Sequence, residues 1–153
     1  MMMFKLLGLL AALNLVTPMF SANAVALESA DAVAEKSVEA SKPLALVYWG
    51  PGACLTCWAS AAQVARKAGF QVKMVGAHFK NFSLLKTAKL WVQPGGKSRT
   101  AAKAMGSKYL SEIREFVRNG GSYVGFCAGA FLSTSEIGTS GYPGLGIVPG
   151  RTE

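Results

Sequence analysis

Cys127 is the residue whose type and surroundings most clearly indicate chemistry. It lies in the segment 125–129, Gly-Phe-Cys-Ala-Gly, after an apolar stretch of strand length and before residues that favour a helix. A sharp turn from a strand into a helix lifts a nucleophile out at the carboxyl edge of a sheet, and a helix N-terminus favours the thiolate. The sequence therefore predicts a nucleophilic cysteine. The alternative is a small buried cysteine that only packs.

Backbone N–H groups that could stabilise an oxyanion are predicted on either side of this cysteine. The N–H of Ala128 is expected to point toward the reacting atom. The motif Pro-Gly-Gly at 94–96 ends another strand about thirty residues upstream. Because glycine lets a backbone N–H face a ligand closely, Gly95 or Gly96 is expected to supply the second donor.

Cys54 and Cys57 form a second constellation. They stand three residues apart where a helix is expected to begin, with Trp58 directly after them. Two cysteines at this spacing can form a structural disulfide, act as a thiol–disulfide redox pair, or remain free thiols. The sequence leaves these three readings open.

Strands and helices alternate from residue 44 onward. Apolar runs predict strands at 44–49, 70–75, 88–93 and 122–126, and the start of a fifth at 144–148. Helical periodicity predicts helices at 58–68, 100–118 and 128–132. This alternation predicts an α/β fold, a mostly parallel sheet with helices on both faces.

The motif-bearing segments resemble a known superfamily. They are the stretches 90–96 (LWVQPGG) and 113–130 (IREFVRNGGSYVGFCAGA), which look like the class I glutamine amidotransferase core. The segments 46–53 (LVYWGPGA) and 144–150 (GLGIVPG) narrow the resemblance to the N-terminal domain of biotin-protein ligases. The resemblance implies a flavodoxin-like sheet in a domain at 44–153. It places Cys127 at the nucleophile position and Gly95, Gly96 and Ala128 in the oxyanion region. Biotin ligation itself is not implied, because the ligase catalytic module is absent.

A catalytic base is not visible. The amidotransferase pattern takes its base from a His oriented by a Glu, both after the nucleophile, whereas the one histidine here, His78, lies before it. In the strand order 2-1-3-4 that the resemblance implies, His78 would stand three strands from Cys127, about 14 Å away. We therefore expect a surface loop residue there, and Glu115 and Glu136 are too generically placed to be assigned a role. Either the chain is truncated at its C-terminal end or it is a non-hydrolytic relative.

Residues 1–24 are typical of a secretory signal peptide. Lys5 precedes an apolar run of eleven residues at 6–16, and Ala22-Asn23-Ala24 forms a cleavage site. Cleavage is expected after Ala24, with Ala26 as a near alternative, and an uncleaved anchor as the competing reading. The mature protein would then be exported, periplasmic or secreted, with no stable membrane anchor. Residues 25–43 read as a linker.

The formal charge of +8 is concentrated in one part of the chain. Between residues 66 and 108 the chain has ten basic residues and no Asp or Glu. They are Arg66, Lys67, Lys73, Lys80, Lys86, Lys89, Lys97, Arg99, Lys103 and Lys108. They are scattered and accompany no nucleic-acid motif, so a solvated surface is expected rather than a nucleic-acid partner. No metal or cofactor is assigned.

Three functions remain open. The first is a cysteine-dependent amide or acyl hydrolase or transferase built on Cys127. The second is a non-catalytic module that binds a small molecule or peptide at the carboxyl edge of the sheet. The third is a thiol–disulfide protein using Cys54 and Cys57.

Overall fold

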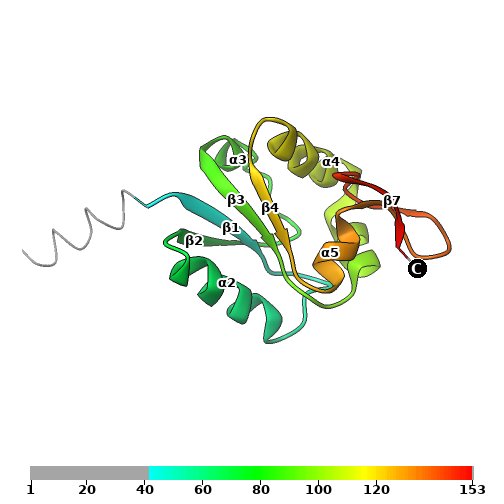
Figure 1. The fold of residues 1–153 in the computed structure, drawn as a ribbon, viewed down its shortest axis with the longest axis horizontal. Coiled ribbons are helices and arrows are strands. Elements are labelled where there is room, and N and C mark those ends of the chain that lie inside the picture. The colour runs from blue at the N-terminus through cyan, green and yellow to red at the C-terminus, as the bar shows by residue number, and fades with distance from the viewer. Residues whose placement is uncertain (1–41, 153) are drawn as a thin grey trace, which may run out of the picture. The chain divides into compact units, whose positions relative to one another are not determined.

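The computed structural model describes residues 42–152, and Figure 1 shows their arrangement. The expected signal peptide and nearly all of the expected linker lie outside the described residues. The described part is built on a four-stranded parallel sheet with the order β2-β1-β3-β4. Its strands are β1 (Leu44–Tyr48), β2 (Gln71–Val75), β3 (Ala88–Gln93) and β4 (Ser122–Gly125). The α/β class and the strand order expected from the resemblance are both confirmed.

Strand β1 is apolar along its whole length because both faces of the sheet are covered there. Residues 45–48 of β1 are fully buried. Since successive side chains of a strand point to opposite faces, Ala45 and Val47 pack on one side while Leu46 and Tyr48 pack on the other. This double burial removes the polar alternation seen in β2, where Gln71 and Lys73 are exposed at the edge of the sheet.

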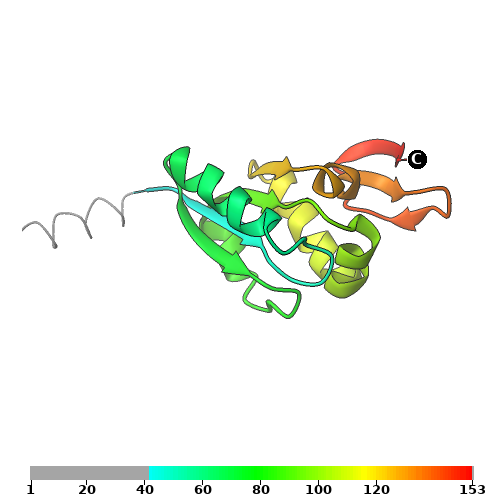
Figure 2. The ribbon, with the colours of Figure 1, turned by 90° about the horizontal axis from the view of Figure 1, so that it is seen from below.

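Different helices cover the two faces (Figure 2). Helix α2 (Cys57–Lys67) packs Ala61, Ala62 and Ala65 against one face. Helices α3 (Ser83–Thr87) and α4 (Ser98–Arg118) cover the other. Helix α4 is kinked at Gly106, where φ is 75° and ψ is 169°. The residues that α2 buries against the sheet are all alanines.

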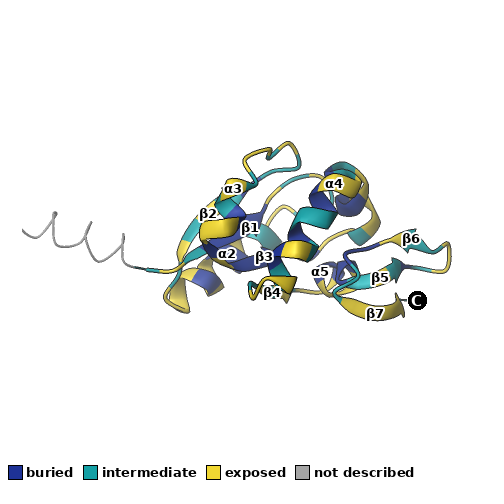
Figure 3. Ribbon diagram, turned by 90° about the horizontal axis from the view of Figure 1, so that it is seen from above, coloured by how far each residue is buried: buried dark blue, intermediate teal, exposed yellow. Residues whose placement is uncertain are grey.

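After β4 the chain forms α5 (Ala128–Leu132) and then a second, three-stranded sheet. Its strands are β5 (Thr134–Ile137), β6 (Tyr142–Pro143) and β7 (Val148–Thr152), in the order β6-β5-β7. Strand β5 pairs antiparallel with β6 and parallel with β7. Figure 3 shows that β7 is largely exposed.

The expectation of a fifth strand at 144–148 is wrong. Only Val148 of that segment belongs to a strand, and the strand joins the second sheet. Gly144 is pressed against the backbone of Thr134, so that a Cβ there would lie 2.2 Å from its carbonyl oxygen. Gly146 has a positive φ of 64°. These contacts make 144–147 a connecting loop, held from the other side by Arg114, which donates hydrogen bonds to the carbonyls of Gly144 and Leu145.

Between residues 42 and 152, no helix combines the length and the apolar character that crossing a bilayer requires.

Candidate functional site

Cys127 lies in a strained turn between β4 and α5. Its φ is 50° and its ψ is −113°, and it is the only non-glycine residue between 42 and 152 with a positive φ. A side chain in this region of φ/ψ space costs on the order of 1–3 kcal/mol and persists only where the surroundings enforce it. The side chain of Cys127 is exposed and its thiol is free.

Two glycines enforce the turn. A Cβ on Gly125 would lie 2.5 Å from the carbonyl carbon of Gly129, and a Cβ on Gly129 would lie 2.2 Å from the carbonyl oxygen of Gln93. The N–H of Phe126 donates to that same carbonyl of Gln93 at 3.0 Å. The absence of a side chain at 125 and 129 therefore permits close backbone approach, and the turn packs tightly against the end of β3.

Gln93 and Tyr123 help to hold the turn, and sequence reasoning did not select them. The buried Gln93 side chain accepts a hydrogen bond from the indole N–H of Trp91 through Oε1 at 3.2 Å. The hydroxyl of Tyr123 donates to the carbonyl of Gly129 at 2.7 Å, and burial raises the pKa of Tyr123 above its ordinary value. The one signal in the sequence was a glutamine at the end of an otherwise apolar strand.

The loop after β3 lies directly beside Cys127. Gly95 is buried, and a Cβ placed on it would lie 3.4 Å from Cβ of Cys127 and 3.4 Å from Sγ of Cys57. Gly96 has a φ of 141° and faces the backbone of Gly52, which leaves no room for a side chain. The sequence predicts that this loop lies beside the turn at Cys127, and in the structure Gly95 does so.

The loop after β1 fixes that arrangement from the other side. Ala53 and Gly96 form an isolated antiparallel bridge. Around it, the N–H of Cys54 donates to the carbonyl of Gly95 at 3.0 Å, and the N–H of Lys97 donates to the carbonyl of Gly52 at 2.7 Å. The first turn of α2 is thereby held next to the ends of β3 and β4.

Within residues 42–152, three backbone N–H groups in the turn at Cys127 and the loop after β3 have no backbone carbonyl as acceptor. They are the N–H groups of Gly95, Gly96 and Ala128. Uncommitted N–H groups near a nucleophile are the requirement for stabilising an oxyanion.

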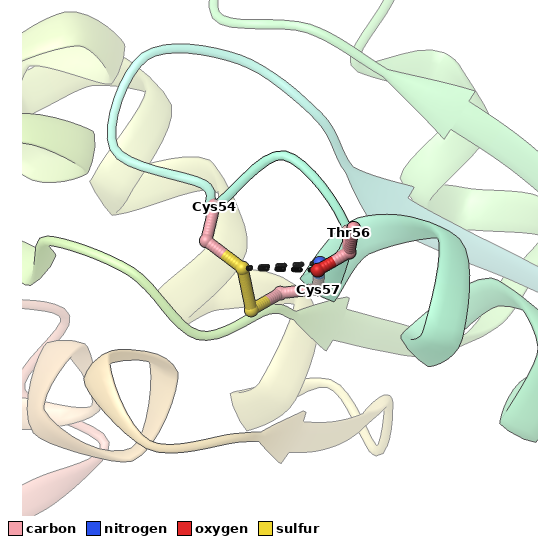
Figure 4. Close-up of a disulfide and its surroundings, with 3 residues drawn as sticks. All are labelled: Cys54, Thr56 and Cys57. Carbon is pink, nitrogen blue, oxygen red and sulfur yellow. Dashed lines mark hydrogen bonds between the residues drawn. A yellow bond between two sulfur atoms is a disulfide. The ribbon is translucent and has the colours of Figure 1, made fainter.

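Cys54 and Cys57 are joined in a disulfide (Figure 4). Cys54 Sγ accepts a hydrogen bond from the N–H of Cys57 at 3.1 Å and lies 3.9 Å from the hydroxyl of Thr56. Of the two cysteines, Cys57 is the one that faces the turn at Cys127.

A hollow of about 270 Å³ opens over these groups. Its lining is mainly apolar and comes from α2, the loop after β3 and the turn after β4: Thr56, Cys57, Ser60, Ala61, Val64, Gly95, Phe126 and Cys127. Its volume suits a small ligand. The lining contains no imidazole and no carboxylate.

The other residues considered as bases lie elsewhere. The exposed His78 lines a separate hollow of about 360 Å³ beyond the ends of β1 and β2. Glu115 pairs with Arg118 at 2.7 Å, and Glu136 pairs with Arg151 at 2.5 Å, both in exposed ion pairs. Among residues 42–152, no group of three or more His, Cys, Asp or Glu side chains could hold a metal. The ten basic residues between Arg66 and Lys108 are all exposed.

The parallel sheet with helices on both faces has the class I glutamine amidotransferase-like fold. A candidate peptidase E of Listeria monocytogenes EGD-e has the same fold, with a TM-score of 0.54 at 16% identity over 71% of this chain and 63% of that one. Residues 44–150 match the family described as "Biotin-protein ligase, N terminal", and the chain belongs to this family.

One curated relative is similar over a short region. The pyridoxal 5'-phosphate synthase subunit PdxT of Picrophilus torridus is 40% identical over 55 residues, which are 36% of this chain and 29% of that protein. The chain thus spans about three tenths of the length of this relative and somewhat under two thirds of the solved structure.

Proposed function

We propose that this domain is a cysteine-dependent acyl hydrolase or transferase in which Cys127 is the nucleophile. The observation that carries the proposal is the enforced positive φ of Cys127 in an exposed turn at the carboxyl edge of the sheet. Strain of this kind concentrates at functional sites, and no packing role accounts for it because the thiol is exposed.

The surrounding groups support covalent acyl chemistry. The thiolate of Cys127 would attack the carbonyl carbon of a bound acyl group, and the N–H groups of Ala128 and Gly95 would stabilise the oxyanion that forms. The leaving group departs with the electron pair of the broken bond, and water or a second acceptor then releases the acyl group from sulfur.

The lining of the hollow suggests the substrate class. Val64, Ala61 and Phe126 make it apolar, and its volume of about 270 Å³ admits a small acyl or aryl group. Because the lining supplies no imidazole or carboxylate, donors with good leaving groups, such as thioesters and activated esters, should react faster than unactivated amides.

Acylation of the full chain by p-nitrophenyl acetate and p-nitrophenyl butyrate tests the proposal. Intact-mass measurement should detect one acyl group per chain, located on Cys127, and Cys127→Ala should abolish it. The double variant Cys54→Ser/Cys57→Ser, which leaves Cys127 as the only cysteine, is the control and should still be labelled, at a changed rate because Cys57 lines the hollow. Equal labelling of wild type and Cys127→Ala would overturn the nucleophile assignment and favour a binding module at the same hollow.

We also infer that the protein is exported and works in an oxidising compartment. Residues 1–24 have the pattern of a signal peptide. A disulfide between Cys54 and Cys57 is the form expected in the periplasm or outside the cell. Cell fractionation and N-terminal sequencing of the mature chain test this inference, with Val25 as the expected first residue. A cytoplasmic chain that retains Met1 would contradict it.

A further inference from the structure

A free cysteine and a disulfide lie on the two sides of Gly95, which has no side chain. A Cβ on this glycine would lie 3.4 Å from Cys57 Sγ and 3.4 Å from Cβ of Cys127. Both side chains also line the same hollow, whereas Cys54 does not.

We propose that Cys127 exchanges with this disulfide, so that the site alternates between two connectivities. In one, Cys54 and Cys57 are linked and Cys127 is free. In the other, Cys57 and Cys127 are linked and Cys54 is free. The second connectivity removes the nucleophile from acyl chemistry without an external oxidant.

The exchange step balances within the chain. The thiolate of Cys127, having released its proton to solvent, attacks Sγ of Cys57 and forms the Cys57–Cys127 bond. The Cys54–Cys57 bond breaks, its electron pair goes to Cys54 Sγ, and that thiolate takes up a proton from solvent.

The hydrogen bonds around the disulfide set the direction of attack. Cys54 Sγ already accepts the N–H of Cys57 at 3.1 Å and lies within reach of the Thr56 hydroxyl at 3.9 Å, as Figure 4 shows. These donors stabilise negative charge on Cys54, which makes Cys54 the better leaving group. Cys57 Sγ, the sulfur under attack, is the one that faces the hollow.

The inference does not rest on the proposed acyl chemistry, since disulfide connectivity is measured without substrate. Wild-type chain is incubated overnight at pH 8 without reductant and quenched with acid. Free thiols are then blocked with N-ethylmaleimide in denaturant. Trypsin places Cys54 and Cys57 in residues 37–66 and Cys127 in residues 119–151, and chymotrypsin cleaves after Leu55 to separate Cys54 from Cys57. A Cys57–Cys127 peptide with Cys54 carrying N-ethylmaleimide is expected, and Cys127→Ser should lose both signals.

Two matched single variants sharpen the test. Cys54→Ser keeps Cys57 and Cys127, while Cys57→Ser keeps Cys54 and Cys127. With glutathione disulfide as oxidant, the Cys54→Ser chain should form its internal disulfide at least about tenfold faster than the Cys57→Ser chain. Two thiols that line the same hollow react at a far higher effective concentration than two that do not. Equal rates in folded variants would overturn the proposal. Should either variant unfold, the wild-type map decides, and the absence of any Cys57–Cys127 peptide there would overturn it.

Discussion

Cys57 and Cys127 flank Gly95, with Sγ of the former and Cβ of the latter each 3.4 Å from the point where a Cβ on that glycine would stand. The two cysteines come from opposite ends of the site, one from the first turn of α2 and the other from the turn after β4. The glycine between them has no positive φ, so a small side chain fits its backbone.

Gly95→Ala should therefore fold and yet impair the site. A methyl group in van der Waals contact with both cysteines would separate them and narrow the hollow. We expect acylation of Cys127 and formation of the Cys57–Cys127 disulfide each to slow by at least about tenfold, with a change in the free energy of unfolding below about 1 kcal/mol. Acylation kinetics, peptide mapping and urea unfolding measure the three quantities. Unchanged kinetics would show that the closeness of these side chains has no chemical role.

Gly129→Ala should destabilise the fold, because its Cβ would lie 2.2 Å from the carbonyl oxygen of Gln93. The clashing atoms belong to the backbone of Gln93, which cannot move aside as a flexible side chain could. We therefore expect the free energy of unfolding, measured in urea, to fall by at least about 2 kcal/mol. Gly76→Ala is the matched control. Its nearest contact would be 3.4 Å and its φ is not positive, so its stability should change by less than about 1 kcal/mol. Similar stabilities for the two variants would contradict the steric argument.

Cys127→Gly should be more stable than Cys127→Ala by about 1 kcal/mol. At most sites glycine is the less stable choice because it gains more freedom in the unfolded chain. At Cys127 the positive φ of 50° reverses the sign, since only glycine adopts this backbone without strain. Ala130→Gly in α5 is the control and should show the ordinary loss of about 0.5–1 kcal/mol. A Cys127→Gly chain less stable than Cys127→Ala would mean that the turn is not strained.

Three tyrosines should make the stability of the fold fall at alkaline pH. Burial raises the pKa of Tyr48 to about 12 from an ordinary value of 10.0, and burial also raises the pKa of Tyr109 and Tyr123. The native state thus retains these protons where the unfolded chain loses them. Stability should be fully present below pH 10 and decline as the pH rises from about 10 toward 12.

Urea unfolding at pH 8 to 11 in a Cys127→Ser background, which excludes disulfide exchange, tests this expectation. Tyr48→Phe should flatten the decline, although it also removes the hydrogen bond from the Tyr48 hydroxyl to the carbonyl of Pro51. The comparison is therefore made on the slope against pH, not on stability at one pH. A slope unaffected by Tyr48→Phe would contradict the assignment.

Much of the main sheet could be predicted because strands that are buried on both faces consist of continuous apolar residues. The run Leu44–Tyr48 is apolar throughout because both faces of β1 are covered, and the glycines at 95, 125 and 129 mark places where backbones meet. The second sheet could not be predicted in the same way. Residues 144–148 alternate like a strand, but their conformation depends on contacts with Arg114 and Thr134, which lie outside the segment.

The proximity of the Cys54–Cys57 disulfide to Cys127 could not be predicted from the sequence either. Spacing showed that Cys54 and Cys57 begin a helix and that Cys127 follows a strand. It did not show that the Ala53–Gly96 bridge brings the start of α2 over the end of β4. Contacts between loops follow from side-by-side placement in three dimensions, for which local periodicity carries no signal.

The Cys54–Cys57 disulfide has a consequence at the bench, because Cys57 is part of the wall of the hollow. Cysteine hydrolases are commonly assayed with dithiothreitol to keep the nucleophile reduced. Here the same additive would open the wall, create two further thiols and release the first turn of α2 from its covalent tie to the preceding loop. Preparations made with and without reductant are different molecules at this site, so the redox history of a sample belongs in every comparison of its activity.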